Sequence, residues 1–430
     1  MDLKLNLAVL TAKLISRLNL LTGSGATSAP GLYALKIDPG LISKLSGKFS
    51  KNILLSGTNG KTTTTRMISQ ILDTANIKHI HNRAGSNLLR GIASTLIKNN
   101  NPLTKIGLWE VDEAVFPLAC EQIKPDVIIL TNLFRDQLDR YGDLDYVANK
   151  WQQALKNLPS ESIKILNADD PALVFLGKNL KNVFYFGLDP KTTATTIQSN
   201  SMDSIFCFNC GSKLAYKKFF VGHLGIFSCP KCSLNPPSKF TLKSKFKLPG
   251  LYNLYNYTTA ALTAKKLNIA QDKIDQALTN FKPAFGRIET INTPNKTIRL
   301  FLVKNPTGFN QVISTVISEL KMKNITCLIA INDLIADGCD VSWLWDVDFE
   351  KLVKNIKYCL SSGIRAHDLS LRLKYADFKN FATDENLNQA IDKLLNSEAK
   401  EVFIFPTYTC MLEIRKILAS KKLVHKTWND

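Results

Sequence analysis

A glycine-rich turn followed directly by a lysine and a threonine is the clearest chemical signal in this sequence. It lies in the stretch Ile-Leu-Leu-Ser-Gly-Thr-Asn-Gly-Lys-Thr-Thr over residues 53–63. Glycines allow backbone N–H groups to close around an anion, and a helix that begins at the lysine adds a positive field. Lys61 would reach the β- and γ-phosphates of a nucleotide, and the Thr62 hydroxyl would ligate Mg²⁺. We therefore predict an ATP site, the alternative being an ordinary turn between a strand and a helix. The expected contacts are Gly57, Thr58, Asn59, Gly60, Lys61, Thr62 and Thr63.

An acidic motif, Trp-Glu-Val-Asp-Glu at 109–113, follows an apolar run that predicts a strand. An acid at the end of a strand beside a phosphate-binding loop is placed to hold Mg²⁺. Glu110 is the expected ligand, with Asp112 and Glu113 as alternatives. A solvated acidic loop is the other interpretation.

A second polar motif follows the Val-Ile-Ile-Leu run at 127–130. Its Asn132 and Asp136 would orient phosphate, metal or water, and Arg135 would bind an anion. Because the carboxyl ends of parallel strands share one edge of a sheet, both polar motifs are expected beside the glycine turn.

Two Cys-x-x-Cys pairs, separated by eighteen residues, predict a metal site. Four cysteines at this spacing are typical of a tetrahedral Zn²⁺, and four thiolates leave no position for water, so the zinc would be structural. Redox chemistry and nucleic-acid binding by a zinc ribbon are the alternatives. His223 is expected in a loop and not as a ligand. The zinc ligands would be Cys207, Cys210, Cys229 and Cys232.

The composition sets limits on the class of protein. The chain has 430 residues, a net charge of +19 and 45% hydrophobic residues, which predicts a globular protein of two or three domains. The basic residues are spread along the chain, so they fit an acidic substrate, an anionic membrane surface or nucleic acid without favouring the last. No run of about 18 apolar residues occurs, which argues against a membrane-spanning helix. Nine cysteines, four of them in pairs, indicate a reducing compartment.

Residues 1–21 are rich in leucine but also basic, which is typical of an amphipathic helix and not of a signal peptide. We expect its apolar face to pack against the following domain, with contact to a membrane surface as the alternative. That face would carry Leu3, Leu7, Leu10 and Leu14.

Apolar runs and helical patterns alternate along the rest of the chain, which predicts parallel sheets covered by helices. We expect residues 1–47 to pack on a central ATP-binding domain at 48–290, into which residues 203–243 are inserted as a zinc ribbon. A linker is predicted at 290–296, followed by a second α/β domain at 297–430. The expected strands are 53–55, 105–111, 127–131, 162–167 and 182–186 in the central domain, and 298–303, 325–331, 356–360 and 401–405 in the second.

Together, the glycine turn and the motifs at 109–113 and 131–139 resemble the central domain of the Mur ligases, ATP-dependent amide-forming enzymes of bacterial peptidoglycan synthesis. Within that family the sequence is similar to the MurT group, the synthetase subunits of lipid II isoglutaminyl synthases. The cysteine cluster supports this group. The sequence departs from most Mur ligases at Gln137, where those enzymes carry a histidine. Further motifs that support the group lie at 81–87, 302–310, 337–346 and 362–366.

The resemblance implies an α/β fold: a Mur-ligase-like central domain with a mostly parallel sheet and the inserted zinc ribbon, then a Rossmann-like C-terminal domain. It also implies that Asn256 approaches the adenine, although helix capping explains this residue equally well on local grounds. Arg287, in Gly-Arg-Ile-Glu at 286–289, would bind nucleotide phosphate.

The implied activity is ATP-dependent amidation of the D-glutamate α-carboxyl in the lipid II stem peptide, through an acyl phosphate, to give D-isoglutamine. Lys61, with Mg²⁺ held by Thr62 and Glu110, would neutralise the charge of the transferred phosphoryl group. The implied setting is cytoplasmic, with attachment to the inner face of the membrane as an alternative. An amino-acid-adding ligase and a zinc-ribbon ATPase that binds nucleic acid are the competing functions.

Ammonia would come from a GatD-type glutaminase subunit in a heterodimer. No cysteine outside the two pairs lies on the glycine-flanked turn that a glutaminase nucleophile needs, so this chain would not hydrolyse glutamine itself. The resemblance implies that an aspartate of this chain completes the partner's Cys–His pair. Asp346 is the expected residue, with Asp340 and Asp348 as alternatives.

Overall fold

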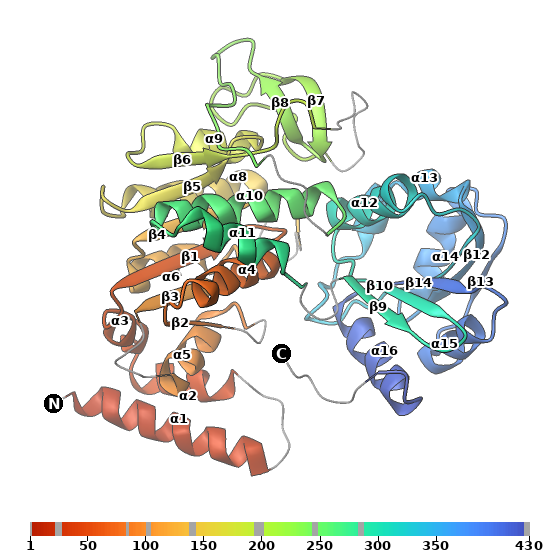
Figure 1. The fold of residues 1–430 in the computed structure, drawn as a ribbon, viewed down its shortest axis with the longest axis horizontal. Coiled ribbons are helices and arrows are strands. Elements are labelled where there is room, and N and C mark those ends of the chain that lie inside the picture. The colour runs from red at the N-terminus through yellow and green to blue at the C-terminus, as the bar shows by residue number, and fades with distance from the viewer. Residues whose placement is uncertain are drawn as a thin grey trace.

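Two six-stranded sheets and one small hairpin form the framework of the protein in this computed structural model (Figure 1). Each large sheet has helices on both faces, and the hairpin lies beyond one edge of the first sheet. The structure describes residues 2–21, 28–82, 86–99, 105–136, 143–192, 202–242, 248–282 and 288–424.

The first sheet is entirely parallel and places the glycine turn at its centre. Strand β1 lies between β3 and β4, with Leu55 paired to Glu110 and Ser56 paired to Leu130. The motifs at 109–113 and 131–139 therefore begin on either side of the glycine turn that follows β1. This is expected, because the carboxyl ends of parallel strands lie at the same edge of a sheet. The sheet order is β2 (His79–His81), β3 (Ile106–Glu110), β1 (Lys51–Ser56), β4 (Val127–Leu130), β5 (Ile163–Asn167) and β6 (Val183–Phe186).

Alternate residues of β1 enter different cores, because successive strand side chains point to opposite faces. Ile53 and Leu55 pack with the helices of one face, and Leu54 packs with those of the other. The first face carries α4 (Lys61–Thr74), α10 (Leu251–Lys266) and α11 (Gln271–Thr279). The second carries α2 (Ala29–Ile37), α3 (Leu41–Ser46), α5 (Leu89–Lys98), α6 (Phe116–Ile123), α8 (Leu144–Lys156) and α9 (Pro171–Gly177).

The second sheet is parallel except for its first strand, β9 (Ile288–Asn292), which forms an antiparallel hairpin with β10 (Thr297–Phe301). The linker predicted at 290–296 is therefore wrong: residues 290–292 end β9, and residues 293–296 form the turn that leads to β10. The strand order is β13 (Phe381–Thr383), β12 (Ile356–Ser362), β11 (Ile325–Ala330), β14 (Glu401–Pro406), β10 and β9.

Within residues 288–424, which the structure describes, seven helical segments accompany the second sheet. The segment that matters most for the site is α12, because it begins at the strand edge that faces the first sheet (Figure 1). The seven segments are α12 (Pro306–Ser314), the π-helix η1 (Thr315–Glu319), the 3₁₀-helix η2 (Ser342–Asp346), α13 (Phe349–Val353), α14 (Ala366–Tyr375), α15 (Leu387–Leu395) and α16 (Tyr408–Ser420).

The insertion folds as an antiparallel hairpin of β7 (Ala215–Val221) and β8 (Leu224–Ser228). It lies beside β6 and α9 (Figure 1). A small apolar core joins it to the main body, with Phe227 of the hairpin and Val174 of α9 among its members.

Helix α1 (Leu3–Leu21) packs on the first unit, but not through the face that we predicted. Ala8 and Ala12 are fully buried against α2 and α5. The leucines of the predicted face are 52–80% exposed. The prediction was wrong because the periodicity locates an apolar stripe but does not say which of two apolar faces finds a partner. Among the described helices, none is long and apolar enough to cross a bilayer.

Candidate active site

The glycine turn adopts the conformation that a phosphate-binding loop needs. Gly57 has a φ of +134° and Gly60 a φ of +86°, a region that residues with a side chain rarely occupy. A Cβ at Gly57 would overlap Thr131 Oγ1, and one at Gly60 would overlap Asn256 Oδ1. The turn ends at the first residue of α4, so it lies at the N-terminus of that helix, where the helix dipole favours an anion.

Asn132 holds the loop from the neighbouring strand edge. Its Oδ1 accepts the N–H of Asn59 at 2.9 Å, its Nδ2 donates to the Asn59 carbonyl at 3.0 Å, and its own carbonyl accepts the N–H of Thr58 at 3.0 Å. Asn256 lies on the other side, where its Oδ1 accepts from the Thr64 hydroxyl at 3.2 Å. The structure thus places both asparagines against the loop, and their contact with a nucleotide stays a prediction.

Thr62 and Glu110 form the pair expected for Mg²⁺. The Thr62 hydroxyl donates to Glu110 Oε1 at 2.8 Å, and the carboxylate is almost fully buried. Asn82 fixes the Glu110 backbone, since its Oδ1 accepts the Glu110 N–H at 2.9 Å and its Nδ2 donates to the Glu110 carbonyl at 2.7 Å. A hydroxyl and a carboxylate at hydrogen-bond distance beside a phosphate loop are the hard oxygen ligands that Mg²⁺ requires, so these residues fit the ion.

Lys61 forms an ion pair with an acidic residue of the 109–113 motif. Its Nζ lies 2.7 Å from Glu113 Oε2 and also donates to the carbonyl of Gly57 at 2.5 Å, within a buried site. Burial alone would raise the pKa of the Glu113 carboxyl, but the charges of Lys61 and Lys304 and the Lys61 hydrogen bond hold that pKa below its usual range. Glu113 is therefore the counter-ion of Lys61 in this structure.

The second unit meets the phosphate loop through the residues that follow β10. Asn305 Nδ2 donates to Asn59 Oδ1 at 3.1 Å, while its own Oδ1 caps α12 by accepting the Gly308 N–H at 2.8 Å. Lys304 Nζ lies 2.5 Å from Asp136 Oδ2. The loop after β10 therefore faces the predicted phosphate-binding loop.

The carboxyl of Asp136 and the ammonium of Lys304 perturb one another. Burial, reinforced by the nearby Glu113 charge, raises the pKa of Asp136 against the opposing effect of Lys304. Burial would lower the pKa of Lys304, but Asp136 and Glu113 raise it. With Lys61, these groups form an alternating set of two cations and two carboxylates in the cleft between the two sheets.

Two cavities adjoin the site, one at the Thr62–Glu110 pair and the other at the Lys304–Asp136 pair. One of about 300 Å³ opens beside the Thr62–Glu110 pair and is lined by polar groups from α4, the end of β2 and the residues after α11. The other lies on the side of the second unit. The first is lined by Thr62, Thr65, Arg66, Ser69, Gln70, Asp73, His81, Asn82, Glu110, Phe281 and Lys282, and the second by Arg135, Asp136, Lys304, Asn305, Pro306, Asp337, Asp340, Ser342, Trp343 and Asp346.

The three candidate aspartates differ in surroundings. Asp348 is buried and pairs with Lys351 at 2.7 Å. Asp340 accepts the N–H of Ser342 at 2.8 Å. Asp346 is half-buried and lies 3.4 Å from Arg135 Nη2.

Arg135 connects Asp346 to the insertion. Its Nε and its backbone N–H both bind Asp203, the latter at 2.9 Å. Burial raises the pKa of the Asp346 carboxyl, and Arg135 opposes this rise. Arg135, which we expected to bind an anion, therefore binds two carboxylates of the chain itself in this structure.

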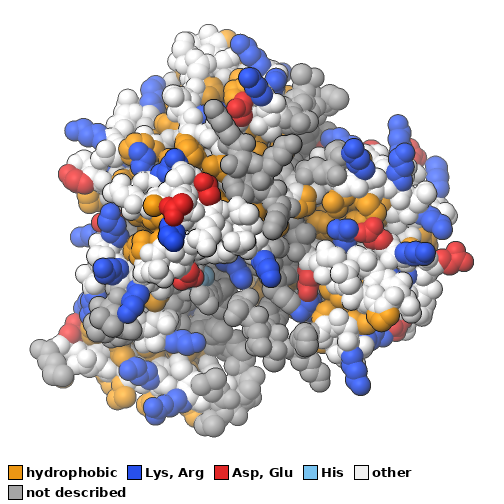
Figure 2. Space-filling model, in the orientation of Figure 1, with side chains coloured by type: hydrophobic (Ala, Val, Ile, Leu, Met, Phe, Trp, Pro, Cys, Tyr) orange, Lys and Arg blue, Asp and Glu red, His pale blue; other side chains and the backbone are white. Residues whose placement is uncertain are grey.

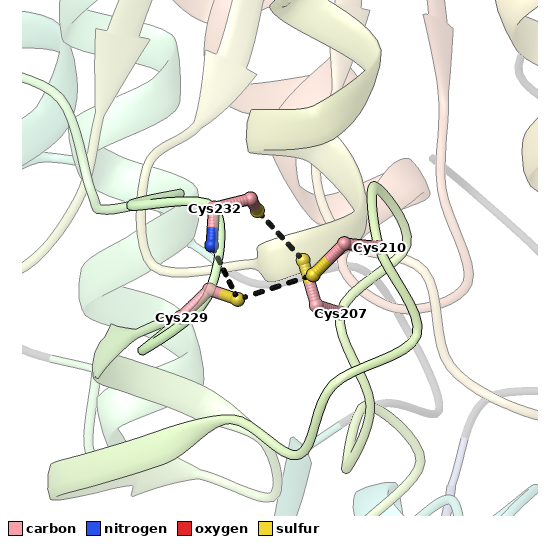
Figure 3. A group of neighbouring side chains, drawn as sticks. All are labelled: Cys207, Cys210, Cys229 and Cys232. Carbon is pink, nitrogen blue, oxygen red and sulfur yellow. Dashed lines mark hydrogen bonds between the residues drawn. The ribbon is translucent and has the colours of Figure 1, made fainter.

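The four paired cysteines converge as predicted (Figure 3). Their sulfur atoms all lie within 4.8 Å of one another, with Cys207 Sγ 3.6 Å from Cys232 Sγ and Cys210 Sγ 3.4 Å from Cys229 Sγ. Four sulfurs around a tetrahedral zinc stand about 3.8 Å apart, so this cluster matches the ion without a disulfide. Gly211, at a φ of +71°, completes the first turn by donating its N–H to the Cys207 carbonyl.

His223 lies in the turn of the hairpin, as predicted, but it is fully buried. Its ring packs on Phe134 at 4.3 Å between centroids, and its Nε2 lies 3.7 Å from Asp170 Oδ1. The hairpin therefore contacts the loop that follows β4. Arg287 and Gln137 lie outside the described residues.

We expect Asn132→Ala to weaken ATP binding by about tenfold to a hundredfold, because it removes two hydrogen bonds that fix the loop. The KM for ATP measures the effect, and thermal unfolding shows whether the variant is folded. Asn157→Ala, at an exposed position after α8, is the control. An unchanged KM in the Asn132 variant would contradict this role.

Two family models and several known proteins are similar to this chain. The family model "Mur ligase middle domain" matches residues 55–264, and "MurT ligase C-terminal" matches residues 302–411. The subunit MurT of lipid II isoglutaminyl synthase (glutamine-hydrolyzing) from Streptococcus pneumoniae is 30% identical over 100% of both chains. The subunit of that name from Staphylococcus aureus strain COL is 32% identical over 94% of this chain and 95% of the relative.

The fold has matches among solved structures. A pseudomurein peptide ligase type C from Methanothermus fervidus superposes with a TM-score of 0.68 at 20% identity, over 86% of this chain and 79% of that one. This level of identity shows the shared fold alone. Given the full-length sequence matches, the chain belongs to the MurT family of the Mur ligases.

Proposed function

We propose that this chain is the synthetase subunit of a lipid II isoglutaminyl synthase. It would use ATP to convert the α-carboxyl of D-glutamate in the lipid II stem peptide to the amide of D-isoglutamine. The observation that carries the proposal is the full-length similarity to two subunits of that name, together with the phosphate loop and its Thr62–Glu110 pair.

The reaction would proceed in two balanced steps. The carboxylate oxygen attacks the γ-phosphorus of ATP, giving an acyl phosphate and ADP, and ammonia then displaces inorganic phosphate to form the amide. The loop N–H groups and Lys61 would bind the transferred phosphoryl group. To do so, Lys61 would leave Glu113 and bind phosphate oxygens instead. Mg²⁺ held by Thr62 and Glu110 would supply positive charge to the phosphates. Asn132 would keep the loop in its binding conformation.

Lys304 would act after the two units close on the nucleotide. It lies in the same cleft as Lys61 and is held by Asp136, so it supplies a second cation toward the reacting phosphate. Asn256 and Arg287 are proposed as further nucleotide contacts. We also propose residues 48–282 as the ATP-binding domain and 288–424 as the second domain, with the boundary moved to precede β9.

Ammonia would come from a glutaminase subunit of the GatD type. The partner would dock near η2, where Trp345 is half-exposed and packs on Tyr375 at 5.4 Å between ring centroids. Asp346, which is half-buried, is proposed to complete the partner's Cys–His pair, with Asp340 as the alternative, because Asp348 is buried. Asp346 lines the same cavity as Lys304, so ammonia released there would enter the synthetase cleft.

A structural Zn²⁺ held by the four cysteines completes the proposal. The ion would fix the hairpin that carries His223 and would take no part in the reaction, because four thiolates fill its coordination sphere.

The test is ADP release by the purified chain with ATP, Mg²⁺, lipid II and ammonium chloride, followed by mass analysis of the product. We expect an amidated product with ammonium alone, and with glutamine only when the partner subunit is present. Absence of amidation with ammonium would refute the proposal. Product formed with an amino acid in place of ammonium would indicate an amino-acid-adding ligase, and salt-sensitive binding of DNA or RNA without carboxylate-dependent ADP release would indicate the nucleic-acid ATPase.

Asp346→Asn is expected to lower the glutamine-dependent rate by about a hundredfold and the ammonium-dependent rate much less, because a positioning carboxylate acts on the partner's histidine. Asp340→Asn and Asp348→Asn are matched controls. The measurement is the ratio of the two rates for each variant with the partner present. An equal loss of both rates in Asp346→Asn would remove this residue from glutamine hydrolysis.

A further inference from the structure

Helix α1 carries an apolar stripe that no described part of the chain covers. Leu3, Leu7, Leu10, Leu14 and Leu18 are 52–80% exposed, at spacings of three and four residues. At about 100° per residue, these five side chains fall within roughly 80° of one another around the helix axis. Single exposed leucines are ordinary, whereas five on one side of one helix form a continuous patch.

The stripe is not the face that holds the helix in place. Ala8 and Ala12 lie on the opposite side and are fully buried, with Leu5 and Val9 partly buried next to them. The helix is therefore anchored to α2 and α5 through small residues, and its larger leucines project outward. Attachment of this helix to the rest of the chain does not require the exposed leucine stripe.

Basic residues border the stripe on both sides. Lys13 and Arg17 project along one border and Lys4 along the other, and all three are exposed. Helix α1 contains no acidic residue. The preceding Asp2 is engaged, because it pairs with Lys44 at 2.7 Å and accepts the N–H of Leu5 at 3.0 Å. In Figure 2, hydrophobic and basic side chains lie next to one another along the lower edge, where Figure 1 places α1.

We propose that the outer face of α1 docks on an anionic phospholipid bilayer, with the leucines at the boundary of head groups and acyl chains and the cations on lipid phosphates. A leucine stripe bordered by cations, without an acid, has the charge and shape of an interfacial helix. Two copies of this chain would instead bring like charges together, since α1 offers no carboxylate to pair with Lys13 or Arg17.

The position of α1 suits a substrate that carries a lipid. Helix α1 contacts α5, and α5 begins seven residues after Asn82, which lines the 300 Å³ cavity beside Glu110. Docking would hold that part of the molecule near the bilayer. This step rests on the proposed function, whereas binding to lipid itself does not.

The test is sedimentation of the full chain with vesicles of phosphatidylglycerol and phosphatidylcholine that contain no lipid II, compared with vesicles of phosphatidylcholine alone. We expect binding to the anionic vesicles that weakens with salt. Leu7→Gln/Leu10→Gln/Leu14→Gln should bind at least tenfold more weakly. Lys13→Gln/Arg17→Gln should lose roughly fivefold per charge and much of the salt dependence.

Matched control variants distinguish binding through this surface from nonspecific binding to vesicles. Leu118→Gln/Ile335→Gln/Leu371→Gln replaces exposed apolar residues of other segments, and Lys150→Gln/Lys156→Gln removes two charges from α8. Both controls should bind as the unchanged chain does. Because all these positions are exposed, unchanged thermal unfolding is expected and is measured for each variant.

Three outcomes would overturn the proposal: no binding to anionic vesicles, equal binding by the leucine variant and its control, or a dimer that the leucine variant abolishes in sedimentation velocity. The last would assign the stripe to a second copy. Amidation of a lipid II analogue with a short, water-soluble prenyl chain should be unchanged in the leucine variant. Vesicle binding without any amidation would refute the proposed function and leave the docking surface intact.

Discussion

Lys61→Met is expected to reduce ADP release by at least about a thousandfold, because it removes the only loop side chain that carries a full positive charge to the γ-phosphate. The substitution also leaves Glu113 buried without its hydrogen-bonded cation. Breaking such a pair costs about 3 kcal/mol of stability, so low activity in this variant alone would not distinguish chemistry from unfolding.

The double variant Lys61→Met/Glu113→Gln separates the two effects. It replaces the buried pair by two uncharged side chains of similar size, so it should regain most of the melting temperature that Lys61→Met loses. Its ADP release should stay as low as that of the single variant. Recovery of activity together with stability would show that Lys61 acts only in folding.

Cys207→Ser is the second substitution with a large expected effect. It should remove zinc from the chain and lower the free energy of unfolding by more than about 4 kcal/mol, because metal binding at a four-cysteine site is coupled to folding. For a domain of this size the melting temperature should fall by roughly 8 °C or more. Zinc per chain, by atomic emission, and thermal unfolding measure both effects.

Cys339→Ser is the control, since Cys339 is exposed and outside the cluster. It should keep one zinc per chain and an unchanged melting temperature. A chelator should reproduce the effect of Cys207→Ser in the unchanged chain. If Cys207→Ser retained both metal and melting temperature, the cluster would not be a structural zinc site.

Local patterns predicted the framework of the site well. The strands at 53–55, 127–131 and 401–405 were expected within one or two residues of β1, β4 and β14, because continuous apolar runs bounded by polar residues are typical of buried parallel strands. Residue types and spacings predicted the phosphate loop and the cysteine cluster, and they favoured Glu110 as the acid beside Thr62 while leaving Asp112 and Glu113 as alternatives.

Features that depend on packing were not predicted. Strands β2 and β13 are three residues each, too short for a periodic signal, and β9 is recognised as a strand only by its pairing with β10. The outward leucines of α1 were assigned to the core because a helical stripe does not reveal its partner. The Lys61–Glu113 pair joins residues 52 positions apart, so no local pattern could identify it.

The guanidinium of Arg135 has a consequence for the molecule as a whole. It binds Asp203 in the insertion and Asp346 in the second unit, while its own backbone lies in the loop that follows β4 of the first sheet. The contact between the two units and the contact of the insertion with the first unit therefore share one residue. Thermodynamic linkage makes such coupling reciprocal: if bound zinc raises the affinity for ATP, then bound ATP must raise the affinity for zinc by the same factor.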